Sequence, residues 1–574
     1  MMDIAAEVPL AGESARAALP RWLPGVALVA LVIAAYPPAL GAGWVWDDDY
    51  YVTNNPTLAS AEGLRRIWFQ IGAVPQYYPL VHTTFWIEHR LWGLTPVGYH
   101  LDNVLLHGIA SVLLWRVLRR LEVPGAWVAA AIFAIHPVHV ESVAWVTERK
   151  NVLSGAMYFA AALAYLHFTQ RGAWRFYALA CLLFVLALLS KTVACSLPAA
   201  ILIVIWWKRG RITARDIAPL VPFFIVGAAL AMLTGWMEKH VVGAWGPEWQ
   251  FSFGQRCIIA GRASWFYLIH LIAPWPLMFV YPRWDLTRGD GLMYAFPLGA
   301  AVVLAGLILG HRRIGRGPAA AGMYFIGTLV PALGFVNTLP MRYSFVADHF
   351  VYLASAGAIA AFVAACAHHL RSTTASRIVV AAIIIALMAM TWHRCYAFRD
   401  AETLWRDTLA KNPSAWMAQH NLGNILLGRG DLDEAEQRFR EAMRLKPDHV
   451  EARVSMGQVA EKRNQFVEAE RWYRDALAIE PGNPLALYNL SRLARIYNTI
   501  GARLATEGHF TEAERAFRQA IGADGDYADA HLNLGIVLEK QGKSREAERA
   551  YRQALRIDPN SARARQRLDV LLHQ

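Results

Sequence analysis

The sequence predicts an all-α protein in two parts, a polytopic membrane helix bundle followed by a soluble α-solenoid. Apolar runs of about 20 residues, long enough to cross a bilayer as helices, recur throughout residues 1–395 and are nearly absent from 396–574. At 56% hydrophobic residues over 574 positions, the chain is too apolar for a single soluble domain. In 396–574, small and aromatic residues recur at a fixed spacing instead. We therefore assign 1–395 to a membrane domain and 396–574 to a soluble domain.

The apolar runs predict about eleven membrane spans. They lie near residues 22–40, 99–118, 126–145, 151–168, 174–190, 192–207, 217–235, 292–310, 319–338, 348–367 and 376–393. Basic clusters occur in every second loop, so we expect a cytoplasmic N-terminus and an extracytoplasmic C-terminal domain. Segment 256–280 would break this alternation if it crossed once, and we interpret it as interfacial or re-entrant.

The net charge of +12 is explained largely by these short basic loops, and nucleic-acid binding is not indicated. The compact loops and overall composition suggest a multi-pass protein of a bacterial inner membrane with a periplasmic C-terminal domain. The five cysteines show no metal-ligand spacing. No cofactor is indicated, and a divalent metal is left open.

The loop 41–98 is long, is expected outside the membrane, and opens with three consecutive acids. Its first residues, 41–55, are GAGWVWDDDYYVTNN. Asp47, Asp48 and Asp49 stand between tryptophans and tyrosines of the kind that gather at membrane interfaces. Acids in loops are usually solvated turn residues, but a carboxylate held at the edge of the hydrocarbon can meet a lipid-borne substrate. Stretches 58–70 and 80–92 are expected to form short helices along the membrane.

The soluble half has a period of 34 residues. Glycines stand at 423 and 457 and, after about ten inserted residues (484–493), at 501 and 535; an alanine follows each glycine by twelve residues and an aromatic follows that alanine by four. This pattern resembles the tetratricopeptide repeat, whose stacked helical pairs bind peptides or proteins in a concave groove. We expect repeats at 416–449, 450–483, 494–527 and 528–561, a half repeat at 397–413 and a cap at 562–574.

A polar group ends the third predicted span on the outer side. His136 and His139 are three residues apart and share a helix face, and Glu141 follows them. One interpretation is a metal site completed by a ligand from another segment, such as His349. We favour the other, a hydrogen-bonded cluster that supports a nearby site.

Cations gather on the same outer side. Arg149, Lys150, Lys191 and Arg342 come from different loops. Snorkelling at the interface would explain any one of them. Basic residues are least expected on the outer side, however, so we expect the group to bind a lipid phosphate or pyrophosphate. His349 can contact a phosphate when protonated or as a neutral donor.

Carboxylates opposite a phosphate-binding cationic group suit glycosyl transfer from a polyprenyl-phosphate sugar. The carboxylate takes the proton of an acceptor hydroxyl as its oxygen attacks the anomeric carbon. The cations stabilise the phosphate that leaves. An aspartate of ordinary pKa is already ionised at neutral pH, as this role requires.

At these residues the chain resembles the GT-C glycosyltransferases, which use lipid-linked donors. It is most similar to the transmembrane and tetratricopeptide repeat-containing group related to protein O-mannosyltransferases. The resemblance rests on VWDDDYYVTNNP (45–56), YYPLVHTTFWIEHRLWG (77–93), GYHLDNVLLHG (98–108), FAIHPVHVESVAWVTERKNVLS (133–154) and FVADHFVYLASAG (345–357). It implies that Asp47 is the catalytic base and Asp48 its partner or a metal contact. Relatives often have Glu-Arg before Tyr-Leu-Tyr where this chain has Asp348 and His349, so an arginine role there does not carry over.

We therefore expect a membrane glycosyltransferase that moves a sugar from a polyprenyl-phosphate donor, similar to dolichyl phosphate, to an acceptor hydroxyl on the extracytoplasmic face. Protein Ser or Thr is the expected acceptor, and the repeat domain is expected to recruit it or a partner protein. One alternative is a non-catalytic, membrane-anchored repeat scaffold. Another keeps the fold but modifies a cell-envelope glycan or lipid.

Overall fold

The computed structural model describes residues 20, 22–286, 291–369 and 373–573, and all regular secondary structure within them is helical, as predicted. The chain divides into two compact units, Met1–Asn412 and Pro413–Gln574, whereas the sequence analysis placed the boundary after residue 395. Helix α19 (Ala401–Lys411), expected as a half repeat, lies in the first unit. Residues 1–19, expected in the cytoplasm, and Gln574, the end of the expected cap, lie outside the described residues.

Among the described residues of the first unit, seven helical segments are long and apolar enough to cross a membrane. Their main helices are α5 (Pro96–Arg120), α8 (Arg149–Arg171), α10 (Leu197–Arg209), α12 (Val221–His240), α14 (Ala295–Leu309), α17 (Tyr352–His369) and α18 (Thr374–Cys395). An eighth results if α6 (Ala126–Ile135) and the segment Pro137–Ala144, bent by 51°, cross as one span. Eleven spans therefore stay a prediction. The other helices at predicted spans, α1 (Leu23–Ala35), α9 (Trp174–Leu188) and α16 (Gly317–Leu329), are shorter.

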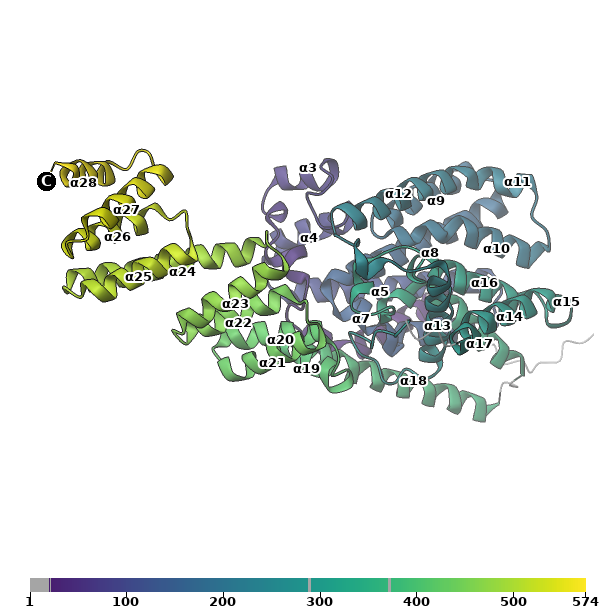
Figure 1. Cartoon of the computed structure of the whole chain (residues 1–574). Coiled ribbons are helices and arrows are strands. Elements are labelled where there is room, and N and C mark those ends of the chain that lie inside the picture. The colour runs from purple at the N-terminus through teal and green to yellow at the C-terminus, as the bar shows by residue number, and fades with distance from the viewer. Residues whose placement is uncertain (1–19, 21, 287–290, 370–372, 574) are drawn as a thin grey trace, which may run out of the picture. The chain divides into compact units, whose positions relative to one another are not determined.

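Helices α5 and α8 lie in the middle of this unit, and α18 runs along its edge (Figure 1). In α5 and α8, 56% of the apolar stretch is buried, against none in α14 and 6% in α18. The central helices are joined by a polar contact, because His107 of α5 lies 2.8 Å from the Tyr352 hydroxyl of α17. The apolar faces of α14 and α18 are exposed, as expected for helices that contact lipid.

The long loop after α1 carries the acids and two helices. The expected short helices are present as α3 (Ala61–Phe69) and α4 (Pro79–Trp92). Helix α3 begins at Ser60, whose hydroxyl accepts a hydrogen bond from the Gly63 amide and caps the helix. Helix α4 begins at a proline, a residue suited to the first turn of a helix. Segment 256–280, interpreted as interfacial or re-entrant, overlaps α13 (Phe253–Ile272), which is not among the seven span candidates of the described residues.

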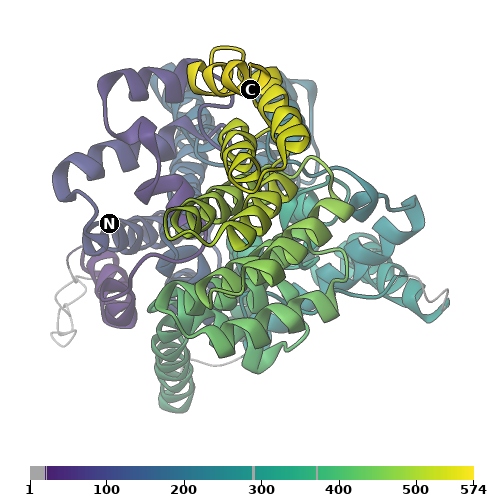
Figure 2. The same ribbon diagram turned by 60° about the vertical axis from the view of Figure 1, so that its left-hand side comes forward.

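The second unit consists of helical pairs stacked in succession (Figure 2). The helices are α20 (Trp416–Arg429), α21 (Leu432–Leu445), α22 (Val450–Lys462), α23 (Phe466–Ile479), α24 (Pro484–Thr506), α25 (Phe510–Ala523), α26 (Ala528–Lys540), α27 (Ser544–Ile557) and α28 (Ala562–Leu572). The inserted residues 484–493 lengthen α24 at its start instead of forming a loop. The recurring glycine lets each pair pack closely: a Cβ on Gly457 would lie 2.3 Å from the Tyr473 ring, and one on Gly535 would lie 2.4 Å from Tyr551.

Candidate active site

The acids of the long loop are presented by a turn at Trp46. This residue has a φ of 44°, a left-handed conformation that costs a non-glycine residue roughly 1–2 kcal/mol. Its ring packs against Trp145 at 5.5 Å and Phe279 at 5.3 Å, and Trp405 of α19 lies 6.3 Å away. Aromatic packing offsets the backbone cost and holds the two residues that follow in position.

Asp48 is anchored in the interior. Its carboxylate accepts hydrogen bonds from the Val45 amide at 2.9 Å, the Thr147 amide at 2.9 Å and the Thr147 hydroxyl at 2.6 Å. Burial, and secondly the charge of Asp47, raise the pKa of Asp48 to about 7. With its oxygens engaged in this way, Asp48 ties the acid loop to the segment before α8.

Asp47 differs from its neighbour in having an unused oxygen. Its buried Oδ1 has no hydrogen-bond partner among the described residues. Burial raises the pKa of Asp47 to about 6, while the positive charge of Lys150 opposes the shift. This corrects the expectation of an ordinary pKa: removing the carboxylate from water disfavours its charged form. Asp49, in contrast, is exposed and accepts a bond from the Thr53 hydroxyl at 2.8 Å.

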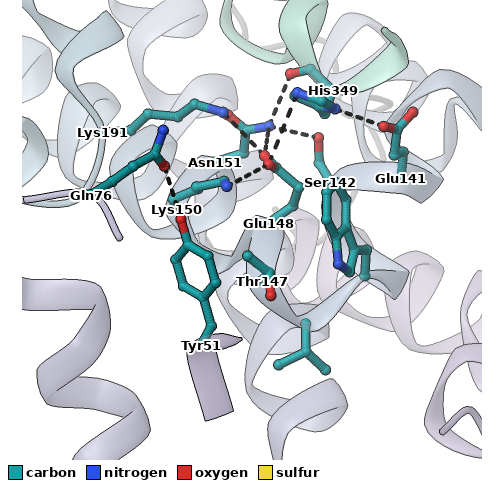
Figure 3. Close-up of polar contacts among 12 residues, drawn as sticks. Tyr51, Gln76, Glu141, Ser142, Thr147, Glu148, Lys150, Asn151, Lys191 and His349 are labelled. Carbon is teal, nitrogen blue, oxygen red and sulfur yellow. Dashed lines mark hydrogen bonds and ion pairs between the residues drawn. The ribbon is translucent and has the colours of Figure 1, made fainter. Parts of the chain in front are cut away.

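Glu148 is the centre of a buried charge cluster (Figure 3). Its oxygens lie 3.1 Å from the ammonium of Lys150 and 3.1 Å from that of Lys191. The Asn151 amide donates to Glu148 at 2.7 Å, and Nε2 of His349 lies 3.9 Å away. The Glu148 side chain is 1% exposed, so these partners replace its water shell. We call Glu148, Lys150, Lys191 and His349 the Glu148 cluster.

His349 links this cluster to Glu141. Its Nδ1 lies 2.6 Å from a Glu141 oxygen, so Glu141 turns towards His349 and not towards the two histidines that precede it in sequence. His349, in the short helical turn Asp348–Val351 before α17, thus contacts a residue 208 positions earlier. The structure brings three of the predicted phosphate ligands, Lys150, Lys191 and His349, together around one carboxylate.

Two predicted phosphate ligands lie elsewhere. Arg149 is 1% exposed and donates to Glu88 at 2.6 Å, to the Tyr99 carbonyl at 2.8 Å, to Thr84 at 3.1 Å and, at short range, to Asn103. It therefore joins α8 to α4 and α5, and its donors face away from the Glu148 cluster. Arg342 lies 2.8 Å from Glu248. In neither case do the contacts support the expected phosphate-binding role.

His136 and His139 are held by the protein's own groups. Nε2 of His136 lies 3.1 Å from the Leu271 carbonyl. The ring of His139 lies 2.8 Å from the Phe133 carbonyl and 2.9 Å from the Ser355 hydroxyl, one contact for each nitrogen. Both rings therefore support packing beside the site, and the metal interpretation gains no ligand from them. No group of three or more His, Cys, Asp or Glu side chains suited to a metal occurs in the described part of the chain.

Glu148, the central acid, was not predicted from the sequence, and neither was the wall beside Lys150 formed by Tyr51, Gln76 and Glu238. On this wall the Tyr51 hydroxyl donates to Gln76 at 3.0 Å, and Gln76 donates to Glu238 at 2.6 Å. The Lys150 ammonium lies 5.1 Å from the centre of the Tyr51 ring, within cation–π range. The available signal was an acid directly before two cations, in a segment already singled out for its polarity.

Comparison with known proteins adds independent findings. Residues 75–236 match the family described as dolichyl-phosphate-mannose-protein mannosyltransferase, and residues 398–443, 420–484 and 499–562 match the tetratricopeptide repeat. The first match includes Glu148, Lys150 and Lys191 and begins after Asp47 and Asp48.

The chain is also similar to curated proteins over part of their length. It is 24% identical to the protein O-mannosyl-transferase F38B6.6 of Caenorhabditis elegans over 439 residues, 71% of this chain and 61% of that protein. It is 33% identical to the protein O-mannosyl-transferase Tmtc1 of Drosophila melanogaster over 176 residues, 29% of this chain and 20% of that protein. The chain thus spans less than two thirds of the length of these relatives.

Among solved structures, the repeat protein YrrB is 21% identical, with a TM-score of 0.17, over 29% of this chain and 98% of that one. Taken together, the matches join a region similar to dolichyl-phosphate-mannose-protein mannosyltransferases to C-terminal tetratricopeptide repeats in one chain that carries several apolar, membrane-length helices.

Proposed function

We propose that this protein is a membrane glycosyltransferase that moves a sugar from a polyprenyl-phosphate donor to a hydroxyl group of an acceptor protein, at Ser or Thr, on the extracytoplasmic face. One observation supports the proposal: the buried Oδ1 of Asp47 has no hydrogen-bond partner among the described residues, and the positive charge of Lys150 in the Glu148 cluster acts on this carboxylate. A proton acceptor beside a cation suits this reaction. Similarity to mannosyltransferases over residues 75–236 supports the same class of reaction.

In the proposed reaction Asp47 is the general base. The acceptor hydroxyl gives its proton to Oδ1 of Asp47 while its oxygen forms a bond with the anomeric carbon of the sugar. The bond from that carbon to the phosphate oxygen breaks, and its electron pair stays with the polyprenyl phosphate. Asp48, anchored by Val45 and Thr147, holds the loop so that Asp47 keeps its position.

The Glu148 cluster is proposed to receive the phosphate. Lys150 and Lys191 each have an ammonium group 3.1 Å from Glu148. A sugar phosphodiester carries one negative charge, and the leaving monoester gains a further one. The cations therefore stabilise the transition state more than the bound donor, as catalysis requires.

We propose that the site faces the periplasmic side of an inner membrane. The second unit is proposed to recruit the acceptor protein or a partner protein. Repeats of this kind present an extended concave surface, which suits binding of a peptide segment.

Incubation of the purified full chain with a panel of radiolabelled polyprenyl-phosphate sugars and periplasmic proteins tests the proposal. We expect transfer of label to protein with a subset of donors, and its loss when the proteins are treated to release O-linked sugars. Running each reaction with and without a metal chelator settles metal dependence. Absence of sugar release or transfer with every donor would contradict the proposal.

The raised pKa of Asp47 predicts a pH dependence. The base must be ionised to take a proton, and its pKa is about 6 instead of 3.8. We expect kcat to be constant above pH 7, to fall to about half near pH 6, and to drop about tenfold for each further pH unit. A rate that stays constant down to pH 4.5 would show that Asp47 does not act as a base with this pKa.

A further inference from the structure

A groove of about 1000 Å³ runs between α5, α8, α10, α16 and α17. Its walls are mainly apolar and include aromatic side chains, and α17 contributes only small residues, among them Gly357, Ala360, Ala361 and Ala364. These small side chains fill little of the space beside α17. A peptide would leave its backbone polar groups unpaired against such walls, whereas a hydrocarbon chain needs no hydrogen bonds.

The groove begins about 14 Å along α8 from the Glu148 cluster and extends away from it. That helix begins at Arg149, next to Glu148, and lines the groove from Tyr158 to Gln170. At 1.5 Å per residue, Gln170 is about 30 Å from the start of the helix, which is about the thickness of the hydrocarbon core. The Gln170 end of the groove therefore lies at the opposite membrane face from the candidate active site.

Cations surround this end. Arg120, Lys208 and Arg209, at the ends of α5 and α10, line the groove with one acid, Glu122, beside them. Arg209 is paired with Asp216 at 2.6 Å, and Lys208 is 3.9 Å from Glu122. Arg120 donates a hydrogen bond to the neutral side chain of Gln170. The Nε atom of Arg120 has no hydrogen-bond partner among the described residues. The rim thus carries an excess of positive charge next to an apolar channel.

We propose that this groove binds an anionic phospholipid, with its acyl chains between α8 and α17 and its phosphate at Arg120 and Lys208. An apolar body with one negative headgroup matches the walls and the rim in both polarity and charge. A sugar donor would have its phosphate at the Glu148 cluster, so the cations of the rim, at the other end of α8, would have no anionic partner in it. The site is thus a second lipid site that does not depend on the proposed transfer reaction.

Lipid binding to the purified full chain tests the proposal. The protein is placed in nanodiscs of phosphatidylcholine alone or with phosphatidylglycerol, its Tm is measured, and the lipids retained in mild detergent are identified by native mass spectrometry. We expect phosphatidylglycerol to be retained and to raise the Tm by roughly 3 °C, because a ligand that binds the folded state stabilises it.

Variants of the rim and of the channel test whether phosphatidylglycerol binds in this groove. Arg120→Gln combined with Lys208→Gln is expected to weaken phosphatidylglycerol binding about thirtyfold, since two cations that face the headgroup are lost. Ala361→Leu, which narrows the channel and leaves the charges in place, is expected to reduce retention as well. Arg313→Gln is the matched control, because this exposed arginine does not line the groove. Equal Tm and retention in both lipid mixtures, retention of a polyprenyl lipid instead, or unchanged binding in the double variant would overturn the proposal.

Discussion

Replacing Asp47 by asparagine is expected to lower the rate of sugar transfer by roughly 10²–10⁴-fold, the usual contribution of a positioned general base. The amide has nearly the shape of the carboxylate but cannot take the acceptor's proton. Since the Oδ1 atom makes no hydrogen bond within the described residues, the fold loses little, and the Tm is expected to stay within about 1 °C of wild type. Transfer to protein is measured with radiolabelled donor, alongside the yield of protein in the membrane.

Asp49→Asn is the matched control. Asp49 lies two residues away and is exposed, and its side chain accepts a hydrogen bond from the Thr53 hydroxyl. We expect this variant to keep nearly full activity, so the pair of variants decides between Asp47 and Asp49 as the reacting acid. Full activity of Asp47→Asn, or equal losses in both variants, would refute the assignment of the base.

Replacing Arg149 by alanine is expected to lower the free energy of unfolding by about 3–5 kcal/mol, although its neighbour Lys150 belongs to the proposed site. Four hydrogen bonds are lost, and the side-chain oxygen of Asn103 stays buried without its Arg149 donor. Burial raises the pKa of Glu88 to about 8, and the positive charge of Arg149 opposes this shift. Thermal unfolding of the detergent-purified protein checks the expected large decrease in Tm.

Arg90→Ala provides the control for Arg149→Ala. Arg90 lies on the same helix as Glu88, but it is exposed and bonds to backbone carbonyls of Leu58 and Trp86. Its loss is expected to cost less than about 1 kcal/mol. An Arg149→Ala protein with normal Tm and a strongly raised KM for the donor would instead restore the phosphate-binding role expected from the sequence.

Features that depend on neighbours in sequence could be predicted. The all-helical class follows from apolar runs, and the repeats follow from a glycine that meets an aromatic ring sixteen residues later, as in Gly457 and Tyr473. The short helices α3 and α4 were expected for the same reason. The number of spans could not be settled, because α1, α9 and α16 are shorter than the apolar runs that contain them.

The site could be predicted only as a set of candidates. Asp47, Asp48 and Asp49 look equivalent in sequence, yet one has an unused oxygen, one is anchored by Thr147, and one is exposed. Their different surroundings come from the turn at Trp46 and from a segment about 100 residues later in the chain.

By itself, the sequence determined that this protein is helical, rich in apolar helices of membrane length, and equipped with repeats at its C-terminus, because those properties are set by composition and by short-range periodicity. Only the tertiary structure decided which charges meet. Arg149 and Lys150 are adjacent, but successive residues of a helix point about 100° apart, so one faces Glu88 and the other faces Glu148. His349 contacts Glu141, 208 residues earlier in the chain. The buried carboxylate of Glu141 has no access to water, so its partners are the side chains that the fold brings beside it.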